Sequence, residues 1–308
     1  MNFIDFHCDT ASLIYEKHHE LYINGGHVDI VRMKKAHYAA QWFAFFVNLQ
    51  SLDLNETAFD RFTKMYDYFV KQVSANEDDI EIVSTYEQYK AARENDKIAA
   101  FLSIEEGEVV KDGLSYVDKL EQMGITLMTL TWNFKNSLGT PHNGLKGLSH
   151  YGKEVVEYLN SKKILVDVSH LSDMGMDDVL SISKKPVIAS HSNARTYKAH
   201  SRNLCDRHIR EIASTGGVIG LNFYNEFLAY SGISKMDDLI GMIRYLYRTA
   251  GSDAVVLGTD FDGIDCSLEI AHCGQLPKFR SALTKRFSPA IVDKFMYKNA
   301  ERLIKENF

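Results

Sequence analysis

The first residues of the chain place side chains that can bind a metal inside an apolar segment. In residues 3–10 (FIDFHCDT), Asp5, His7 and Asp9 alternate with other residues. Residues two apart on an extended strand project from the same face, so His7 and Asp9 could bind one ion together. An edge strand whose polar face meets water would show the same alternation. These residues alone leave the two interpretations about equal.

Residues of the same chemical kind follow four later apolar runs. They are Glu105 after the run 98–104, His170 after 164–168, His191 after 186–189 and Asp260 after 254–259. A lone histidine is more often a hydrogen-bonded core residue, and a lone glutamate is more often solvated. That explanation is hard to apply to six such residues at equivalent places of five runs. We therefore interpret the six as one site.

Three histidines and two or three carboxylates suit a pair of divalent ions. Two ions about 3.5 to 4 Å apart can hold a water or hydroxide between them and polarise the atom that it attacks. A carboxylate is the natural bridge between them. These nitrogen and oxygen donors suit Zn²⁺, and Mn²⁺, Co²⁺ or Fe²⁺ match them too. We expect two zinc ions per subunit, with Asp260 able to accept a proton and return it to a leaving amine.

The elements that position these residues alternate along the chain. Apolar runs of strand character lie at 3–10, 39–49, 98–104, 125–132, 164–168, 186–189, 217–223 and 254–259. The patterns between and after them predict helices at 56–74, 114–123, 151–162, 173–183, 207–214, 237–250 and 289–305. In the first of these helices, apolar residues recur at spacings of three and four, which is typical of a helix that covers a core.

Eight strands that are apolar on both faces and mostly separated by helices predict a parallel sheet closed into a (β/α)8 TIM barrel. An open doubly wound sheet is the alternative, but the glycine-rich phosphate-binding turns usual in such sheets are missing. In a barrel, every strand opens onto one face at its C-terminal end, which would bring the six residues together. One domain over residues 1–308 suffices.

Composition argues against several classes of partner. The chain has 308 residues, a net charge of -6 and no long run of like charges, so we expect neither nucleic acid nor a membrane as partner. Its four cysteines form no CxxC pair, which is typical of free thiols in a reducing cytoplasm. The first strand leaves no room for a signal peptide, and no apolar run reaches the roughly 18 to 20 residues of a membrane span. We expect a cytoplasmic protein.

With these residues in hand, the chain resembles the membrane dipeptidase (renal dipeptidase) family of zinc peptidases, within the amidohydrolase-like barrels of metallo-dependent hydrolases. The resemblance covers nearly the whole length through, in order, IDFHCDT, SIEEGE, TLTWN, GLSHYGKEVVEYLN, ILVDVSHLSD, PVIASHSNAR, HSRNLCD, GGVIGLNFY and LGTDFDG. It implies hydrolysis of dipeptides, tolerance of a D-residue on the C-terminal side, and a homodimer.

The resemblance also implies roles for single residues. It implies a first ion held by His7, Asp9 and Glu105, a second held by Glu105, His170 and His191, and Asp260 as the proton-transfer residue. It places Arg202 where the family binds the free carboxylate of the substrate, which a guanidinium can do bidentately. From the sequence alone, an exposed loop arginine is the favoured interpretation of Arg202. Tyr224 is a weaker candidate for the substrate pocket, and Asp5 and Asp262 are candidates to support the ligands.

Two positions depart from the family pattern. The usual E-G-G after the third strand reads Glu105-Glu106-Gly107 here. We assign the bridge to Glu105 because it directly follows the strand, with Glu106 as the competing choice. Mammalian members have a histidine after the fourth strand that contacts the reacting carbonyl oxygen, where this chain has Trp132 and Asn133. Either the substrate preference differs, or Asn133 or another loop donor stabilises that oxygen.

Two other functions fit the same residues. One is another amide hydrolase on the same barrel, such as an N-acyl-amino-acid deacylase. The other is a metal-binding or interaction protein on a degenerate barrel, which the loss of a ligand would indicate, and none is lost. The remaining histidines, among them His27, His142 and His208, lack ligand spacing and are expected at the surface.

Overall fold

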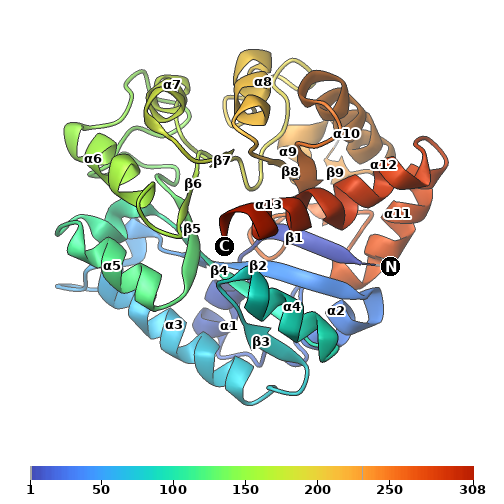
Figure 1. Cartoon of the computed structure of the whole chain (residues 1–308), viewed down its shortest axis with the longest axis horizontal. Coiled ribbons are helices and arrows are strands. Elements are labelled where there is room, and N and C mark those ends of the chain that lie inside the picture. The colour runs from blue at the N-terminus through green and yellow to red at the C-terminus, as the bar shows by residue number, and fades with distance from the viewer. Residues whose placement is uncertain (1, 231) are drawn as a thin grey trace.

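Parallel strands alternate with helices in the computed structural model, which describes residues 2–230 and 232–308 (Figure 1). The main strands are β1 (Phe3–Cys8), β2 (Tyr38–Phe46), β4 (Ile98–Glu105), β5 (Ile125–Thr129), β6 (Leu165–Asp167), β7 (Val187–Ile188), β8 (Ile219–Leu221) and β10 (Val255–Leu257). The helices are α1 (Thr10–Lys17), α2 (Ile30–Ala36), α3 (Ala58–Ser74), α4 (Tyr86–Glu94), α5 (Ser115–Gln122), α6 (His150–Leu159), α7 (Asp173–Ile182), α8 (Asp206–Ser214), α9 (Asn225–Leu228), α10 (Met236–Ala250), α11 (Leu276–Thr284), α12 (Pro289–Asp293) and α13 (Asn299–Asn307).

The main strands close into a parallel barrel. In the described part of the chain, their hydrogen-bonded order is β7-β6-β5-β4-β2-β1-β10-β8. The ring closes between β7 and β8, where the Ala189 N–H donates to the Val218 carbonyl at 3.0 Å and the Gly220 N–H donates to the Ala189 carbonyl at 2.8 Å. The predicted TIM barrel is therefore confirmed, and the open doubly wound alternative is wrong.

Short strands and single turns complete the main elements. Strand β3 (Ile80–Ile82) pairs with the first residues of β4, and β5 pairs with the later residues of β4. Strands β9 (Ile233–Ser234) and β11 (Ser267–Leu268) form a separate pair. Single turns are η1 (Leu49–Ser51), η2 (Gly107–Val110), η3 (Cys273–Gln275) and the π-helical η4 (Lys294–Lys298). The helix predicted over 289–305 forms without a break, with η4 as a π-helical turn between α12 and α13.

The barrel interior is filled by aromatic rings. Phe6 stacks on Trp42 with ring centroids 4.2 Å apart, and Trp42 stacks on Phe101 at 4.3 Å. Leu303 and Ile304 of α13 belong to the same buried cluster. Figure 1 shows α13 crossing one end of the barrel, with the C-terminus near its centre. This packing leaves the opposite end, where the strands terminate, for a site.

Helix α3 forms where its sequence pattern predicts. Thr57 and Asp60 make a capping box, in which each side chain accepts from the backbone N–H of the other residue. Phe62, Met65 and Phe69 are buried at spacings of three and four. The helix therefore both starts and packs through signals that are local to its sequence.

Strand β1 departs from the regular alternation expected of it. Between Asp5 and Cys8 its pairing advances by three residues while β2 advances by two, which is a β-bulge. Asp9 lies beyond the strand, at the N-cap of α1, with φ -93° and ψ 17°. The expectation that His7 and Asp9 share one face of a regular strand is therefore wrong. The bulge and the turn into α1 bring them together instead.

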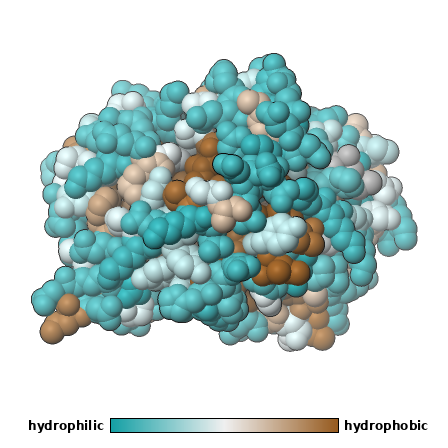
Figure 2. Space-filling view, turned by 90° about the horizontal axis from the view of Figure 1, so that it is seen from below, coloured by the Kyte–Doolittle hydropathy of each residue, from teal (hydrophilic) through white to brown (hydrophobic). Residues whose placement is uncertain are grey.

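The face in Figure 2 is covered mainly by hydrophilic residues, with hydrophobic ones gathered in separate patches. Among residues 2–230 and 232–308, none of the helices has the length and apolar character needed to cross a bilayer. Cys8, Cys205, Cys266 and Cys273 are free thiols, as predicted.

Candidate metal centre

The strand ends bring the six predicted residues to one place. One group of donor atoms within 4.8 Å of one another comes from His7, Asp9 and Glu105, a second from Glu105, His170 and His191, and a third from His7, His191 and Asp260. These residues lie on β1 and β4 or a few residues beyond the ends of β1, β6, β7 and β10. The closed barrel therefore brings residues more than 250 positions apart in the sequence together at one end of the strands.

Glu105 lies between the first two groups. Its Oε2 is 3.4 Å from His7 Nε2, which in turn is 3.3 Å from Asp9 Oδ2. Its Oε1 is 3.1 Å from His170 Nε2 and 3.6 Å from His191 Nε2. The two oxygens of one carboxylate thus face two different donor groups, which is the arrangement that a bridging ligand requires.

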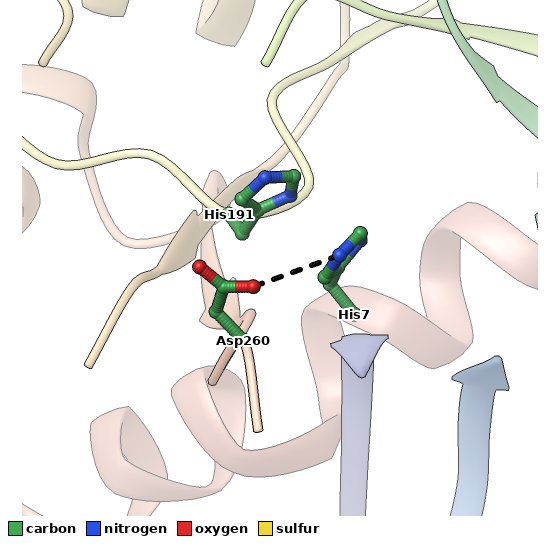
Figure 3. A group of neighbouring side chains, drawn as sticks. All are labelled: His7, His191 and Asp260. Atoms are coloured by element: carbon green, nitrogen blue, oxygen red, sulfur yellow. Dashed lines mark ion pairs between the residues drawn. The ribbon is translucent and has the colours of Figure 1, made fainter. Parts of the chain in front are cut away.

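Asp260 faces the same cluster from the end of β10. Figure 3 shows the Asp260, His7 and His191 side chains pointing toward one another, with Asp260 Oδ1 3.7 Å from His7 Nε2. The Asn222 side-chain amide donates to Asp260 Oδ2 at 2.9 Å. Asp260 has φ +62°, a left-handed conformation that aspartate tolerates better than most residues. The turn therefore holds one oxygen of this carboxylate toward the cluster.

Asp5 and Asp262 hold the segments around the cluster. Asp5 accepts from the Thr259 N–H at 2.9 Å and from its hydroxyl at 2.6 Å, next to Asp260. Asp262 accepts from the Thr10 hydroxyl at 2.7 Å and from the His27 N–H. The first contact ties β1 to β10, and the second ties the start of α1 to the loop after β10. Neither carboxylate belongs to the three donor groups.

The carboxylates of the cluster are buried close together. Asp9, Glu105 and Asp260 are each at most 9% exposed. Burial raises the pKa of Asp9 well above its usual range, and the charge of Glu105 adds to this. Burial also raises the pKa of Asp260. Burial opposes ionisation of Glu105 too, but His7 and His170 outweigh it and hold the pKa of Glu105 well below its usual range. The cluster therefore favours a compensating positive charge.

The same atoms fit a divalent metal. His7 Nε2 and Asp9 Oδ1 are buried, and neither has a hydrogen-bond partner in the described part of the chain. His170 Nε2 and His191 Nε2 face each other at 2.9 Å. Imidazole nitrogens and carboxylate oxygens are the donor set that zinc takes in hydrolytic sites. The residues present are thus those that such an ion needs.

Glu106 lies outside the donor groups. Its carboxylate accepts from the Trp132 N–H at 3.3 Å, from the Glu108 N–H at 3.0 Å and from the Asn136 side chain. Burial raises its pKa to about 7. Glu106 therefore fastens the loop that follows β5, while Glu105 alone of the pair faces the histidines.

Asn133 makes a contact that was not predicted. Its side-chain oxygen accepts from His170 Nδ1 at 2.8 Å, which turns His170 Nε2 toward Glu105. The predicted contact of Asn133 with the reacting carbonyl oxygen stays a prediction, and its amide oxygen in addition orients a histidine. Asn133 still lines the cavity beside the cluster.

A cavity of about 390 Å³ opens beside the cluster. Its lining includes Asp9, Glu105, Asp260, Trp132, Asn133, His170, Tyr224 and Phe227. This volume is near the lower end of the range for small-molecule sites, about 300 to 1,000 Å³. Tyr224 lies at the N-cap of α9, beyond the end of β8.

Arg202 is buried rather than exposed. Only 3% of its surface is accessible, so the interpretation as an exposed loop arginine is wrong. Its guanidinium donates to the His191 carbonyl at 3.3 Å and lies 5.4 Å from the Phe227 ring. In the described ranges no carboxylate lies within 4.0 Å of it, and its Nε has no hydrogen-bond partner. Burial lowers its pKa to about 10, so it remains a cation at neutral pH.

A family model for membrane dipeptidases (peptidase family M19) matches residues 1–307. The chain belongs to this family. An uncharacterized dipeptidase of Schizosaccharomyces pombe is 32% identical over 254 residues, which is 77% of this chain and 61% of that protein. An uncharacterized protein from the pqqA 5′ region of Klebsiella pneumoniae is 31% identical over 68% of this chain and 83% of its own length.

Solved structures show the same fold. A metallo peptidase from Rhodobacter sphaeroides, liganded with a phosphinate mimic of L-Ala-D-Ala, superposes with a TM-score of 0.92 at 23% identity, covering 100% of this chain and 99% of that one. The dipeptidase AC, a family M19 metallo peptidase, gives 0.91 at 23% identity over 100% and 98% of the two chains. At this level of identity the likeness concerns the barrel.

Three residues of this membrane dipeptidase family member escaped the sequence analysis. Asp167, Ser190 and Asn222 are fully buried polar residues that contact the cluster or its neighbours. Each lies in or directly after a barrel strand, so a buried polar residue near a strand end was the available signal. Among the other histidines, the surface prediction is wrong for His208, which is buried and bonds Asp177 at 2.7 Å.

Proposed function

We propose that this protein hydrolyses the peptide bond of dipeptides at a site that holds two divalent metal ions. The position of Glu105 carries the proposal, because its two oxygens face separate donor groups 3.1 to 3.6 Å away. Membership of the membrane dipeptidase family supports the reaction class. The dipeptide mimic bound by the structural neighbour from Rhodobacter sphaeroides supports the size of the substrate.

The proposed ligands are those that the sequence suggested. His7, Asp9 and Glu105 would hold one ion, and Glu105, His170 and His191 would hold the other. Bound there, zinc ions would supply Lewis acidity, polarising the scissile carbonyl and lowering the pKa of a water. The protein's own part is to fix these donors and to keep the carboxylates close together in a buried site.

Asp260 is proposed to transfer the proton. Its Oδ1 faces the cluster and its Oδ2 is held by Asn222. It also lines the cavity, so the oxygen that receives a proton from the attacking water can return it to the nitrogen of the leaving amine. One carboxylate then serves as base and afterwards as acid.

Arg202 is proposed to bind the C-terminal carboxylate of the substrate. It is a buried cation without an acidic partner in the described residues, which fits a site completed by an anionic ligand. Arg202 does not line the cavity itself. It lies next to Phe227, which does line the cavity. A carboxylate would have to approach along this side of the cavity. That requirement would limit the length of the peptide.

Several finer points of the proposal come from the resemblance. We propose tolerance of a D-residue at the C-terminal position, zinc as the metal, and a homodimer. Tyr224 lines the cavity and would contact the substrate, and the amide nitrogen of Asn133 would assist the carbonyl oxygen while its oxygen holds His170. Light scattering after size-exclusion chromatography would test the dimer.

A substrate panel tests the reaction against its alternative. Protein stripped of metal and reloaded with Zn²⁺ would be given Xaa-L-Ala dipeptides, Xaa-D-Ala dipeptides and N-acetyl amino acids. Cleavage of the dipeptides is expected, with the stripped protein as control. Cleavage of N-acetyl amino acids alone would favour the N-acyl-amino-acid deacylase and contradict the dipeptidase.

A further inference from the structure

Behind His191, on the side away from Glu105, lies a buried carboxylate that the proposed reaction does not use. Asp167, the last residue of β6, is fully buried. Its Oδ1 accepts from the Ser169 N–H at 3.0 Å and the Ser190 N–H at 2.9 Å. Its Oδ2 accepts from the Thr129 hydroxyl and the Ser190 hydroxyl, both at 2.6 Å. All four donors point at one side chain, so its position is tightly defined.

The Ser190 hydroxyl connects this carboxylate to His191. Its oxygen lies 2.7 Å from His191 Nδ1. A hydroxyl has one proton, and here that proton is donated to Asp167. Toward His191 the oxygen must therefore accept, which places the imidazole proton on Nδ1. His191 Nε2 is then left with its lone pair, directed at the cluster 3.6 Å from Glu105 Oε1.

We infer that Asp167 and Ser190 are positioning residues that fix the tautomer and orientation of His191 for metal binding. The inference rests on the proposed metal site. His170 is oriented differently, because the oxygen that accepts from its Nδ1 belongs to the neutral amide of Asn133. A histidine backed by a carboxylate through a hydroxyl is a stronger electron donor than one backed by an amide. Ser190 and Asp167 would thus stabilise the ion on the His170 and His191 side.

A purely structural role for Asp167 is the competing explanation. The carboxylate joins β5, β6 and β7 through Thr129, Ser169 and Ser190, which would by itself account for a buried aspartate. Two variants separate the explanations, because each removes one hydroxyl from the same oxygen of Asp167. Ser190→Ala breaks the link to His191, whereas Thr129→Val leaves that link intact.

The test is titration of Zn²⁺ into metal-stripped protein in competition with a chelator. We expect two binding steps in the wild type, and Ser190→Ala should weaken one of them about 10- to 100-fold. Thr129→Val should lower thermal stability and leave both steps within about three-fold of wild type. Equal binding by the two variants would overturn the inference while leaving the proposed function intact. Absence of zinc binding by the wild type would instead overturn the proposed function.

A second measurement does not depend on how Ser190→Ala and Thr129→Val fold. In wild-type protein labelled with ¹⁵N-histidine, NMR should show the His191 ring protonated at Nδ1 and not at Nε2, both with and without Zn²⁺. Assignment would use a sample of His191→Gln, which lacks that signal. A ring protonated at Nε2 in the metal-stripped protein would contradict the inference.

Discussion

At the scale of single residues, Glu105 and its neighbour Glu106 are similarly buried but contact different chemical groups. Glu105 contacts three histidines, while Glu106 accepts from backbone N–H groups and an amide of the β5 loop. Glu105→Gln should lower dipeptide hydrolysis by more than about 100-fold and reduce the bound zinc, because the bridge loses its charge. Activity assays and metal analysis would measure both.

Glu106→Gln is the matched control for this change. It should keep its zinc and its activity within a few-fold, and lose about 1–3 kcal/mol of unfolding free energy, since one acceptor oxygen of the loop contacts is replaced. If Glu106→Gln lost zinc and Glu105→Gln did not, the bridge would have been assigned to the wrong residue.

Arg202 permits a test that separates binding from chemistry. Arg202→Met keeps an unbranched apolar stem at this buried position and removes the cation. We expect kcat/KM for dipeptides to fall by at least about thirty-fold, because loss of a buried charge-assisted contact costs about 2–5 kcal/mol. For the matching dipeptide amides, which lack the carboxylate, wild type and variant should be equally active. An equal loss on both substrates would mean that Arg202 does not recognise the carboxylate.

The residues that the sequence could predict share one property. His7 and Asp9 lie within the first apolar run, and Glu105, His170, His191 and Asp260 closely follow later ones. The closure of the barrel therefore determines where they meet. The burial of Arg202 and the contact of Asn133 with His170 depend on how loops fold over the barrel mouth. No periodicity in the sequence encodes that folding.

At the scale of elements, the same division applies. Long apolar runs and amphipathic helices such as α3 were predicted, because their pattern repeats over several turns. The bulge in β1 and the short helices α1, α2, α4, α9 and α11 were not predicted. The sequence of a short helix provides too little stability for the helix to form alone. Its packing against the barrel therefore determines whether it forms.

The close approach of β7, β8 and β10 provides a test of the packing where these strands meet. A Cβ on Gly220 would lie 1.8 Å from the Ser190 carbonyl oxygen and 2.9 Å from Gly258 Cα. Gly220→Ala should therefore lower the free energy of unfolding by about 3 kcal/mol or more, as measured by denaturant titration. Gly25→Ala is the control, since a Cβ there would meet nothing within 4 Å. Similar losses from both substitutions would contradict the close packing.

The entrance to α3 contains an ion-pair cluster with a defined pH dependence. Glu56 accepts from Arg61 and Lys64, each at 2.6 Å, and these contacts lower its pKa to about 2. Because the pKa is lower in the folded state than in the unfolded one, its stabilisation is present above about pH 4.5 and is lost as the pH falls toward 2. In metal-stripped protein, Glu56→Gln should cost about 1–2 kcal/mol at pH 7 and close to nothing at pH 2.

Asp53→Asn is the control for that measurement. Asp53 is 3.6 Å from the same Arg61, but its side chain is 79% exposed. Its loss should leave the unfolding free energy nearly unchanged at both pH values. A cost of Glu56→Gln that stayed the same from pH 7 to pH 2 would contradict the assigned ionisation.

At the scale of the whole molecule, the proposed ions would connect strands from all around the barrel. The donors come from β1, β4, β6 and β7, with Asp260 after β10, so they are assembled only when the barrel is closed. An ion that binds this assembly and hardly binds the unfolded chain stabilises the fold by about 2.7 kcal/mol at one hundred times its dissociation constant. Zinc should thus raise the melting temperature of the stripped protein by roughly 5 °C or more.

The dependence of this shift on the metal and on Glu105 distinguishes the proposed site from non-specific metal binding. Zinc should act at low concentration, while Mg²⁺, which prefers all-oxygen octahedral sites and retains its waters, should have little effect. Glu105→Gln should lose most of the zinc-dependent shift, because both donor groups depend on that one carboxylate. Glu106→Gln should retain the shift although its baseline melting temperature is lower. A full shift in Glu105→Gln would mean that the stabilising ion binds elsewhere, since the closed barrel would then respond to zinc without its bridging ligand.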